Sequence, residues 1–202
     1  ELIDGISSWW CMAHGHNHPA IVAAIRAQAE KFAQVMFAGF THEPAIELAA
    51  ELVKHTPAGV NRIFFADSGS VAVECAAKMA VQYQFAAGRP RRCRLAALRG
   101  GYHGDTAGAM ALCDPEGMHQ VFHGYLQQNF FLPKPRIPFD GEWDESEFKP
   151  MEELLDRHGD EIAAVFIEPV FQGGNAMWFY HPMYMKKLRE AGYVEMDAEG
   201  FL

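Results

Sequence analysis

The sequence has few of the features that mark membrane, disulfide-bonded or nucleic-acid-binding proteins. In its 202 residues no apolar run approaches the roughly 18 residues that a membrane-spanning helix needs. The first residues lack the basic-then-apolar pattern of a signal peptide, so we expect a soluble cytoplasmic protein. Only four cysteines occur, without a Cys-x-x-Cys pair, which favours free thiols. Lys and Arg number 17 against 26 Asp and Glu, and the formal charge of −9 makes nucleic acid a poor partner.

Half of the residues are apolar, and the length allows one good-sized core or two small ones. Apolar periodicity and short apolar runs predict an alternation of helices and strands. The predicted helices cover residues 18–37, 43–54, 71–87, a short stretch ending near 112, 151–158 and 182–190. The predicted strands cover 62–66, 95–98 and 162–167, and residues 115–149 are expected to form a long loop. This alternation predicts an α/β fold with three layers, α/β/α, around a mainly parallel sheet.

Three polar turns follow predicted strands, at residues 67–70, 100–105 and 168–174. Ligand sites in open α/β sheets lie beyond the C-terminal ends of the strands, so these turns are expected to share one edge. The first turn, with Ser68, Gly69 and Ser70, begins a helix. Unpaired N–H groups and the positive helix end favour an anion such as phosphate there, and an ordinary helix N-cap is the alternative.

The other two turns contain candidate binding groups. Tyr102 and His103 lie between glycines, where an aromatic face can stand beside a bound ring, although a purely structural turn would have the same pattern. His103 is a candidate base or ring-stacking group, with a structural role as the alternative. Glu168 ends a strand and either faces a cationic group in the site or caps the sheet.

Several other patterns have simpler interpretations. His14, His16 and His18 alternate as zinc ligands do, but a loop leading into a helix explains them and no metal is predicted. A serine hydrolase using Ser68 or Ser70 with His103 is disfavoured, because the Gly-x-Ser-x-Gly elbow is absent. The following residues have two interpretations each: Trp9 and Trp10 line a core or an apolar pocket, and Arg89, Arg91, Arg92 and Arg94 form a solvated turn or an anion-binding patch.

Together these strings resemble the class III, fold-type I aminotransferases that use pyridoxal 5′-phosphate. The most specific strings are DGISSWW (4–10), HGHNHP (14–19), DSGSVAVE (67–74), GYHGDT (101–106) and IEP (167–169). The Ser-Ser-Trp-Trp and Ser-Gly-Ser-Val-Ala-Val-Glu strings narrow the resemblance to the subfamily that serves biotin synthesis. The likeness covers about residues 1 to 190 and implies an incomplete fold-type I large domain.

The resemblance implies a role for each candidate residue. Ser68, Gly69 and Ser70 resemble the cradle for the cofactor phosphate, and Tyr102 resembles the aromatic that lies against the pyridine ring, with His103 beside it. Glu168 resembles the acidic residue near the cofactor. Trp9 and Trp10, together with Tyr102, resemble the walls of the substrate pocket.

The resemblance also implies a reaction and an assembly. S-adenosylmethionine gives its amino group to the cofactor, which passes it to 8-amino-7-oxononanoate, making 7,8-diaminononanoate. Family members are dimers, so a homodimer is expected for the intact form. Residues 1–202 would be a partial large cofactor-binding domain, without an N-terminal segment and a C-terminal small domain.

The sequence departs from the family after about Arg189. The lysine that binds the cofactor covalently has no match here, since Lys78, Lys186 and Lys187 all lie in predicted helices. Asp197 is a candidate for a displaced partner of the pyridine nitrogen. We therefore expect this chain to be inactive by itself. The alternatives are a non-catalytic chain of the same fold that binds cofactor or partner, and another class III aminotransferase.

Overall fold

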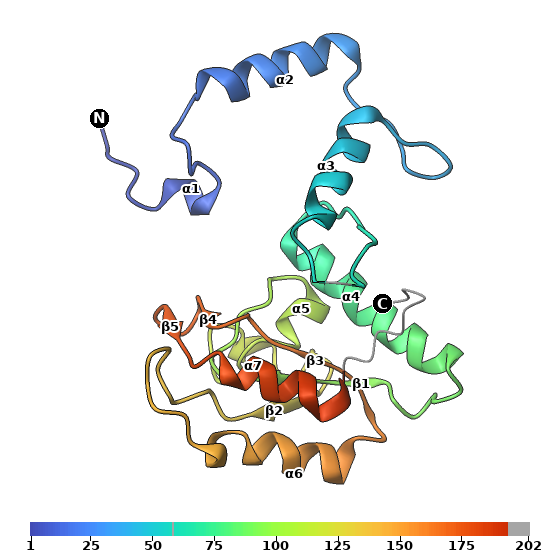
Figure 1. Cartoon of the computed structure of the whole chain (residues 1–202), viewed down its shortest axis with the longest axis vertical. Coiled ribbons are helices and arrows are strands. Elements are labelled where there is room, and N and C mark those ends of the chain that lie inside the picture. Colours follow the sequence, from blue (N-terminus) through green and yellow to red (C-terminus); the bar gives the residue numbers. More distant parts are fainter. Residues whose placement is uncertain (58, 194–202) are drawn as a thin grey trace. The chain divides into compact units, whose positions relative to one another are not determined.

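The computed structural model describes residues 1–57 and 59–193 and divides into two compact units, Glu1–Thr56 and Pro57–Leu202. The first unit contains α1 (Ser7–Trp10), α2 (Pro19–Lys31) and α3 (Glu43–Val53) (Figure 1). The predicted helix over 43–54 is confirmed. The predicted helix over 18–37 is too long, because α2 ends at Lys31. Phe32 takes an extended conformation, and the rings of Phe32 and Phe37 lie 5.5 and 5.3 Å from that of His42, so tertiary contacts override the helical periodicity.

The second unit is built on a parallel sheet of β1 (Arg94–Leu98), β2 (Phe130–Leu132) and β3 (Ile162–Phe166) in the order β2-β1-β3. The predicted strands over 95–98 and 162–167 are confirmed. The strand predicted over 62–66 is wrong: those residues are not part of a strand in the structure, and Phe64 is exposed. A strand exists only where a neighbour completes its hydrogen bonds, which an apolar run cannot reveal.

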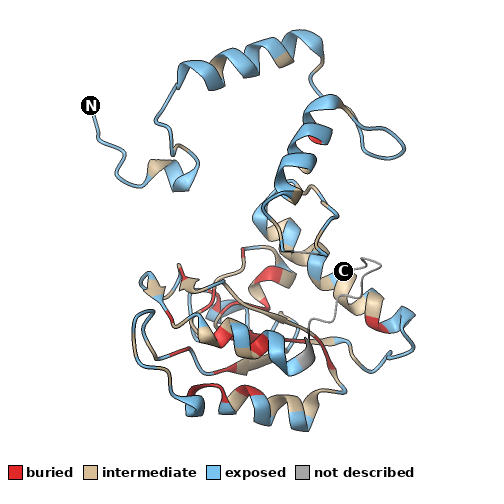
Figure 2. Ribbon diagram, in the orientation of Figure 1, coloured by how far each residue is buried: buried red, intermediate tan, exposed pale blue. Residues whose placement is uncertain are grey.

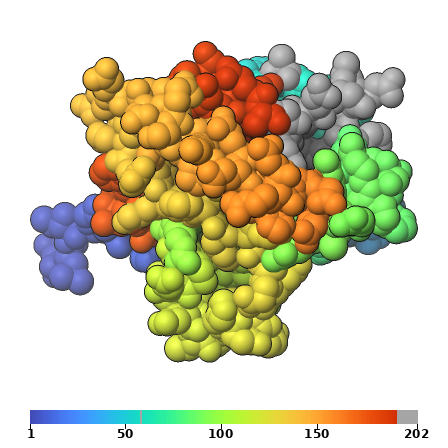
Figure 3. All heavy atoms as spheres, turned by 90° about the horizontal axis from the view of Figure 1, so that it is seen from below, coloured from blue at the N-terminus to red at the C-terminus, as the bar shows by residue number. Residues whose placement is uncertain are grey.

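Helices cover both faces of this sheet, which confirms the predicted three layers. Successive strand residues point to opposite faces. On one face Leu95 and Ala97 of β1 pack against α4 (Gly69–Ala86). On the other face Ala96 and Leu98 share a core with α6 (Lys149–His158) and α7 (Met183–Leu188), which Figure 3 shows in orange and red. The buried residues concentrate along the sheet and the inner sides of these helices (Figure 2).

Short elements fill the connections. They are α5 (Ala107–Met110), η1 (Gln120–Phe122), η2 (Glu145–Glu147), the antiparallel pair β4 (Phe171–Gln172) and β5 (Trp178–Phe179), and the π-helix η3 (Arg189–Tyr193). The expected long loop over 115–149 therefore contains β2 and two short helices, whose few residues give no periodic signal. The helices predicted over 71–87, 151–158 and 182–190 correspond to α4, α6 and α7, with shifted ends.

Two further expectations concern exposed groups. The four cysteines are free thiols, as predicted. The arginine cluster forms a solvated turn: Arg91 lies 2.9 Å from Asp160, and Arg94 pairs with Glu161 while stacking over the ring of Phe130. These carboxylates offset much of the positive charge, so an anion-binding patch is not supported. None of the helices in residues 1–57 and 59–193 combines the length and apolar content required to cross a bilayer.

Candidate functional site

The N-terminus of α4 presents backbone N–H groups. Ser68 is the N-cap, and its Oγ accepts a hydrogen bond from the N–H of Val71 at 3.2 Å, so the predicted N-cap is present. Within residues 1–57 and 59–193, the N–H groups of Gly69 and Ser70 have no acceptor. A helix start with such donors attracts an anion through both hydrogen bonding and the helix dipole. The cap and the anion-binding interpretation are therefore compatible.

The turn after β1 packs directly on this helix start. The N–H of Asp105 donates to Ser70 Oγ at 3.0 Å. Gly104 has a φ of +130°, and a Cβ added there would collide with the Ser70 hydroxyl and lie 2.8 Å from Ser70 Cα. Only glycine allows this approach, because it lacks a Cβ and tolerates a positive φ. The structure thus brings together the first two of the three predicted turns.

Tyr102 belongs to a cluster of polar side chains beside this contact. Its hydroxyl donates to Asp105 Oδ2 at 2.6 Å, and Asp105 Oδ1 lies 2.9 Å from His119 Nε2. The rings of Tyr102 and His119 are stacked, with centroids 6.1 Å apart and planes inclined by 25°. The hydrogen bond to Asp105 raises the pKa of Tyr102 to about 12, and bonds from Tyr102 and His119 lower the pKa of Asp105. Sequence reasoning missed the roles of Asp105 and His119.

His103 points into the protein. The backbone N–H of His103 donates to Cys113 Sγ at 3.1 Å, and its imidazole makes an edge-type contact with the Phe166 ring, with the two ring planes inclined by 84°. Burial lowers the pKa of His103 to about 4, so the imidazole is neutral at pH 7. No hydrogen bond joins His103 to Ser68 or Ser70 in the part of the chain that the structure describes, so the serine-hydrolase arrangement is not assembled. These contacts match the structural alternative for His103.

This buried imidazole predicts a pH-dependent stability. Between pH 6.5 and pH 4 the unfolded chain binds a proton on His103 that the folded chain does not bind. The free energy of unfolding therefore decreases as the pH is lowered through this range. Between pH 7 and 4.5 we expect a loss of roughly 2 kcal/mol from this group. His103→Gln should remove that contribution, while the exposed control His123→Gln should keep it. Urea unfolding at several pH values measures it, and equal pH slopes for wild type and His103→Gln would refute the assignment.

Glu168 connects the second and third turns. Its Oε1 accepts the N–H of Tyr102 at 3.0 Å, and its Oε2 accepts the N–H of Gly173 at 3.0 Å. Among the described residues no cationic side chain pairs with this carboxylate. The structure therefore matches the capping alternative, and Glu168 holds the Tyr102 turn in place. The second and third predicted turns follow β1 and β3 at the C-terminal edge of the sheet, as the parallel arrangement requires, and the first turn meets them through the hydrogen bond from Asp105 to Ser70.

Trp9 and Trp10 belong to the other compact unit. They are 80% and 62% exposed, so neither lies in a core within that unit, and their role as pocket walls stays a prediction. Residues 7–10 all have positive φ, a left-handed turn that Asp4 supports: its Oδ2 accepts from Ser8 Oγ and lies 2.7 Å from His16 Nε2.

No group of three or more His, Cys, Asp or Glu that could hold a metal ion occurs in the described residues, and His16 is engaged with Asp4. Lys186 and Lys187 on α7 pair with Glu190 and Glu145, which belong to none of the three turns. Asp197 lies outside the described residues.

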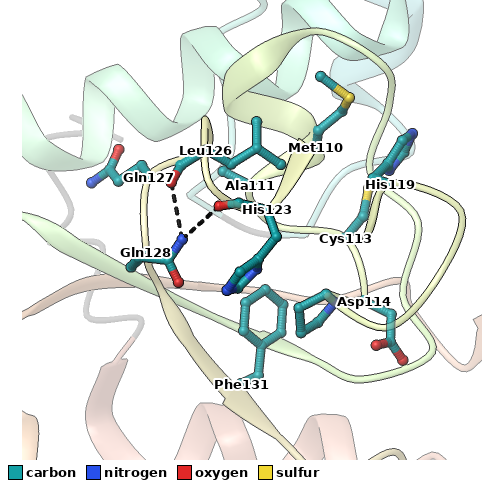
Figure 4. A pocket seen from close by; sticks show the side chains of 11 residues that line it. Met110, Ala111, Cys113, Asp114, His119, His123, Leu126, Gln127, Gln128 and Phe131 are labelled. Atoms are coloured by element: carbon teal, nitrogen blue, oxygen red, sulfur yellow. Dashed lines mark hydrogen bonds between the residues drawn. The ribbon is translucent and has the colours of Figure 1, made fainter. Parts of the chain in front are cut away.

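A small cavity lies next to the Tyr102 cluster. It measures about 20 Å³ and is lined by Cys113, His119 and His123 among others (Figure 4). One water molecule needs about 10 to 15 Å³ on this scale, whereas ligand pockets usually measure about 300 Å³ or more. The cavity is therefore too small for a cofactor, and the open turns remain the better candidate site.

Comparison with known proteins agrees with this geometry. The family model described as aminotransferase class III matches residues 1–193. The adenosylmethionine-8-amino-7-oxononanoate aminotransferase of Mycobacterium leprae is 46% identical over 191 residues, covering 94% of this chain and 43% of the relative. The enzyme of that name from Buchnera aphidicola subsp. Baizongia pistaciae is 44% identical over 190 residues, covering 94% and 44%.

Solved structures show the same likeness. The crystal structure of the aminotransferase of that name from Methanocaldococcus jannaschii matches with a TM-score of 0.85 and 32% identity, over 93% of this chain and 41% of that chain. A PLP-bound amine transaminase from an uncultivated Pseudomonas species matches with a TM-score of 0.82 and 33% identity, over 94% and 45%. The chain thus spans less than half the length of these relatives. It belongs to the class III aminotransferases.

Proposed function

We propose that this chain forms the phosphate- and ring-binding part of a pyridoxal 5′-phosphate-dependent aminotransferase. The complete protein would transfer the amino group of S-adenosylmethionine to 8-amino-7-oxononanoate, making 7,8-diaminononanoate for biotin synthesis as a cytoplasmic homodimer. The names of the relatives at 44% and 46% identity support the substrates. The observation that carries the proposal is the pair of N–H donors on Gly69 and Ser70, next to the turn that bears Tyr102.

The residues present fit a phosphorylated aromatic cofactor. A phosphate dianion satisfies the N–H groups of Gly69 and Ser70 and interacts favourably with the positive end of α4. Gly104 lets the Tyr102 turn lie in direct contact with the helix start, so the two parts of the site are adjacent. Tyr102 supplies an aromatic face that is held by Asp105 and by the backbone bond to Glu168.

Each part of the site then has one task. The cofactor, when bound, supplies an electron sink that stabilises the charge formed when the amino group is transferred. The start of α4 holds the phosphate, and Tyr102 lies against the pyridine ring. Glu168 keeps the Tyr102 turn at the sheet edge through its bond to the backbone of Tyr102. The neutral, buried His103 anchors the same turn through its backbone bond to Cys113. Trp9 and Trp10 are proposed to contact the substrate.

The reaction is tested on the protein encoded by the complete reading frame, extended by sequencing the source DNA beyond the codon for Arg189. With pyridoxal 5′-phosphate, 8-amino-7-oxononanoate and S-adenosylmethionine, we expect 7,8-diaminononanoate, detected by mass spectrometry. Product formed with another amino donor but not with S-adenosylmethionine would assign the chain to a different class III aminotransferase. Absence of product with every donor would favour the non-catalytic alternative.

The isolated 202-residue chain is proposed to be inactive, because none of its lysines matches the lysine that binds the cofactor. Treatment with pyridoxal 5′-phosphate and borohydride should therefore label no single lysine preferentially, apart from low and scattered reaction at exposed amines. Peptide mapping by mass spectrometry measures the labelling. Stoichiometric labelling of one lysine, removed by competing pyridoxine 5′-phosphate, would contradict the inactivity of this chain.

A further inference from the structure

His119 is a buried imidazole that contacts an exposed carboxylate. Its side chain is 8% exposed, whereas that of Asp105 is 68% exposed, and Nε2 and Oδ1 lie 2.9 Å apart. Because an ionised carboxylate only accepts hydrogen bonds, the ring donates through Nε2. The other oxygen of Asp105 accepts from the Tyr102 hydroxyl at 2.6 Å. A buried residue, His119, thus holds the exposed carboxylate of Asp105, which in turn holds the Tyr102 hydroxyl.

The position of His119 is itself fixed. It is the N-cap of η1, and its carbonyl accepts the N–H of Phe122 at 2.9 Å. Its ring also stacks with that of Tyr102, so two contacts, one direct and one through Asp105, act on the same side chain. A half-exposed tyrosine without these contacts would lose more conformational entropy when a ligand orders it.

We infer that His119 is a positioning residue that fixes the ring of Tyr102 through Asp105 before the cofactor binds. The inference rests on the proposed function, because it assigns Tyr102 to the pyridine ring. His119 itself does not contact the cofactor. His119 restricts the motion of the Tyr102 ring and therefore affects recognition of the pyridine ring. Recognition of the phosphate depends instead on the start of α4.

Substitutions at residue 119 distinguish the effect of the hydrogen bond that His119 donates to Asp105 from the effect of the space that its side chain fills. His119→Gln places an amide donor close to the position of Nε2, and His119→Met has similar length without a donor. His123→Met makes the same chemical change at an exposed residue of the same segment. All variants are made in the 202-residue chain, whose secondary structure is compared by circular dichroism.

The first readout is ligand preference, measured by calorimetry at pH 7 with pyridoxine 5′-phosphate and inorganic phosphate as probes. Pyridoxine 5′-phosphate lacks the aldehyde and cannot react with lysines. Wild type, His119→Gln and His123→Met should prefer pyridoxine 5′-phosphate equally. His119→Met should lose up to about tenfold of that preference, since an ordered aromatic contact contributes an affinity of this order. If wild type prefers pyridoxine 5′-phosphate, an unchanged preference in His119→Met, or an equal loss in His119→Gln, would overturn the inference.

The second readout reports on Tyr102 without any ligand. The hydrogen bond to Asp105, burial, and the charges of Asp105 and the neighbouring Cys113 together raise the pKa of Tyr102 to about 12. Burial also raises the pKa of Tyr180 to about 12, so Tyr180 serves as an internal reporter of folding. At pH 11, NMR of 13C-labelled tyrosine should show Tyr102 about one-tenth ionised in wild type and His119→Gln. In His119→Met a larger fraction should be ionised, since the pKa falls when Asp105 no longer holds the phenol, while burial still keeps the pKa above its usual value.

The two readouts separate the possible failures. If wild type does not prefer pyridoxine 5′-phosphate over phosphate but His119→Met still ionises Tyr102, the proposed cofactor site fails and the coupling of His119 to Tyr102 holds. If Tyr102 ionises equally in wild type, His119→Gln and His119→Met while Tyr180 stays protonated, the inference fails whatever the cofactor result.

Discussion

Gly104→Ala is expected to lower the free energy of unfolding of the second unit by about 3 kcal/mol. Losses of this size arise from steric clashes and backbone strain at constrained positions. The added Cβ would collide with the Ser70 hydroxyl and lie 2.8 Å from Ser70 Cα, which belongs to the backbone of α4. A φ of +130° adds strain for any residue with a Cβ. Either α4 or the turn must move, so the hydrogen bond from Asp105 to Ser70 is lost as well. Urea unfolding, analysed with a common slope, measures the change.

Gly124→Ala is the matched control. A Cβ at Gly124 meets no atom within 4 Å, so this substitution should change the free energy of unfolding by less than about 0.5 kcal/mol. Equal stability of the Gly104→Ala chain and the control would show that the turn does not pack on α4 as described. Because Gly104 joins the phosphate-binding and aromatic parts of the site, the same substitution should also abolish binding of pyridoxine 5′-phosphate.

Ser70→Glu is expected to weaken binding of pyridoxine 5′-phosphate by about a hundredfold, the effect of losing charge-assisted hydrogen bonds to an anion. The new carboxylate lies at the positive end of α4, where it competes with the phosphate dianion for the same N–H groups and repels it. It also removes the hydroxyl that accepts the N–H of Asp105. Calorimetric titration at pH 7 measures the dissociation constant.

Ser146→Glu adds the same charge at an exposed residue of η2 and controls for net charge. It should leave the dissociation constant within about twofold of wild type, since it keeps the N–H donors of α4 and the Ser70 hydroxyl, and salt screens its exposed charge. If the Ser70→Glu chain bound pyridoxine 5′-phosphate as tightly as the control, the phosphate would not lie at the start of α4, and the assignment of Ser68, Gly69 and Ser70 would be wrong.

Elements with a local signal were predictable from sequence. The Ala-rich helix after Asp67 has its own N-cap serine, and the apolar runs of β1 and β3 end at glycine or Glu-Pro. β2 has only three residues and lies inside a segment rich in proline and aromatic residues, so the sequence pattern did not predict a strand there. The strand expected over 62–66 has the right composition, but strand formation depends on a neighbour that sequence alone does not reveal.

In the candidate site, likewise, the turns that have a local sequence signal were predictable, and the contacts between distant residues were not. The rule for open sheets brings together the turns at Tyr102 and Glu168, and the structure places both at one edge, with Ser68–Ser70 beside them although residues 62–66 form no strand. The sequence left open whether Ser68 and Glu168 cap or bind; the hydrogen bonds show that both cap, which at Ser68 is compatible with anion binding, and binding stays a prediction. The contact between His119 and Asp105 spans 14 residues without a repeating pattern, so only the folded chain reveals it.

The central claim is that the start of α4 and the Tyr102 turn together bind a phosphorylated pyridine ring. It is tested most directly by titrating the 15N-labelled chain with pyridoxine 5′-phosphate and following its amide resonances by NMR. We expect saturable shifts at Gly69 and Ser70 together with Tyr102 and Asp105, and shifts confined to Gly69 and Ser70 with inorganic phosphate. Saturable shifts that leave Gly69 and Ser70 unmoved, or no saturable shifts at all, would contradict the claim.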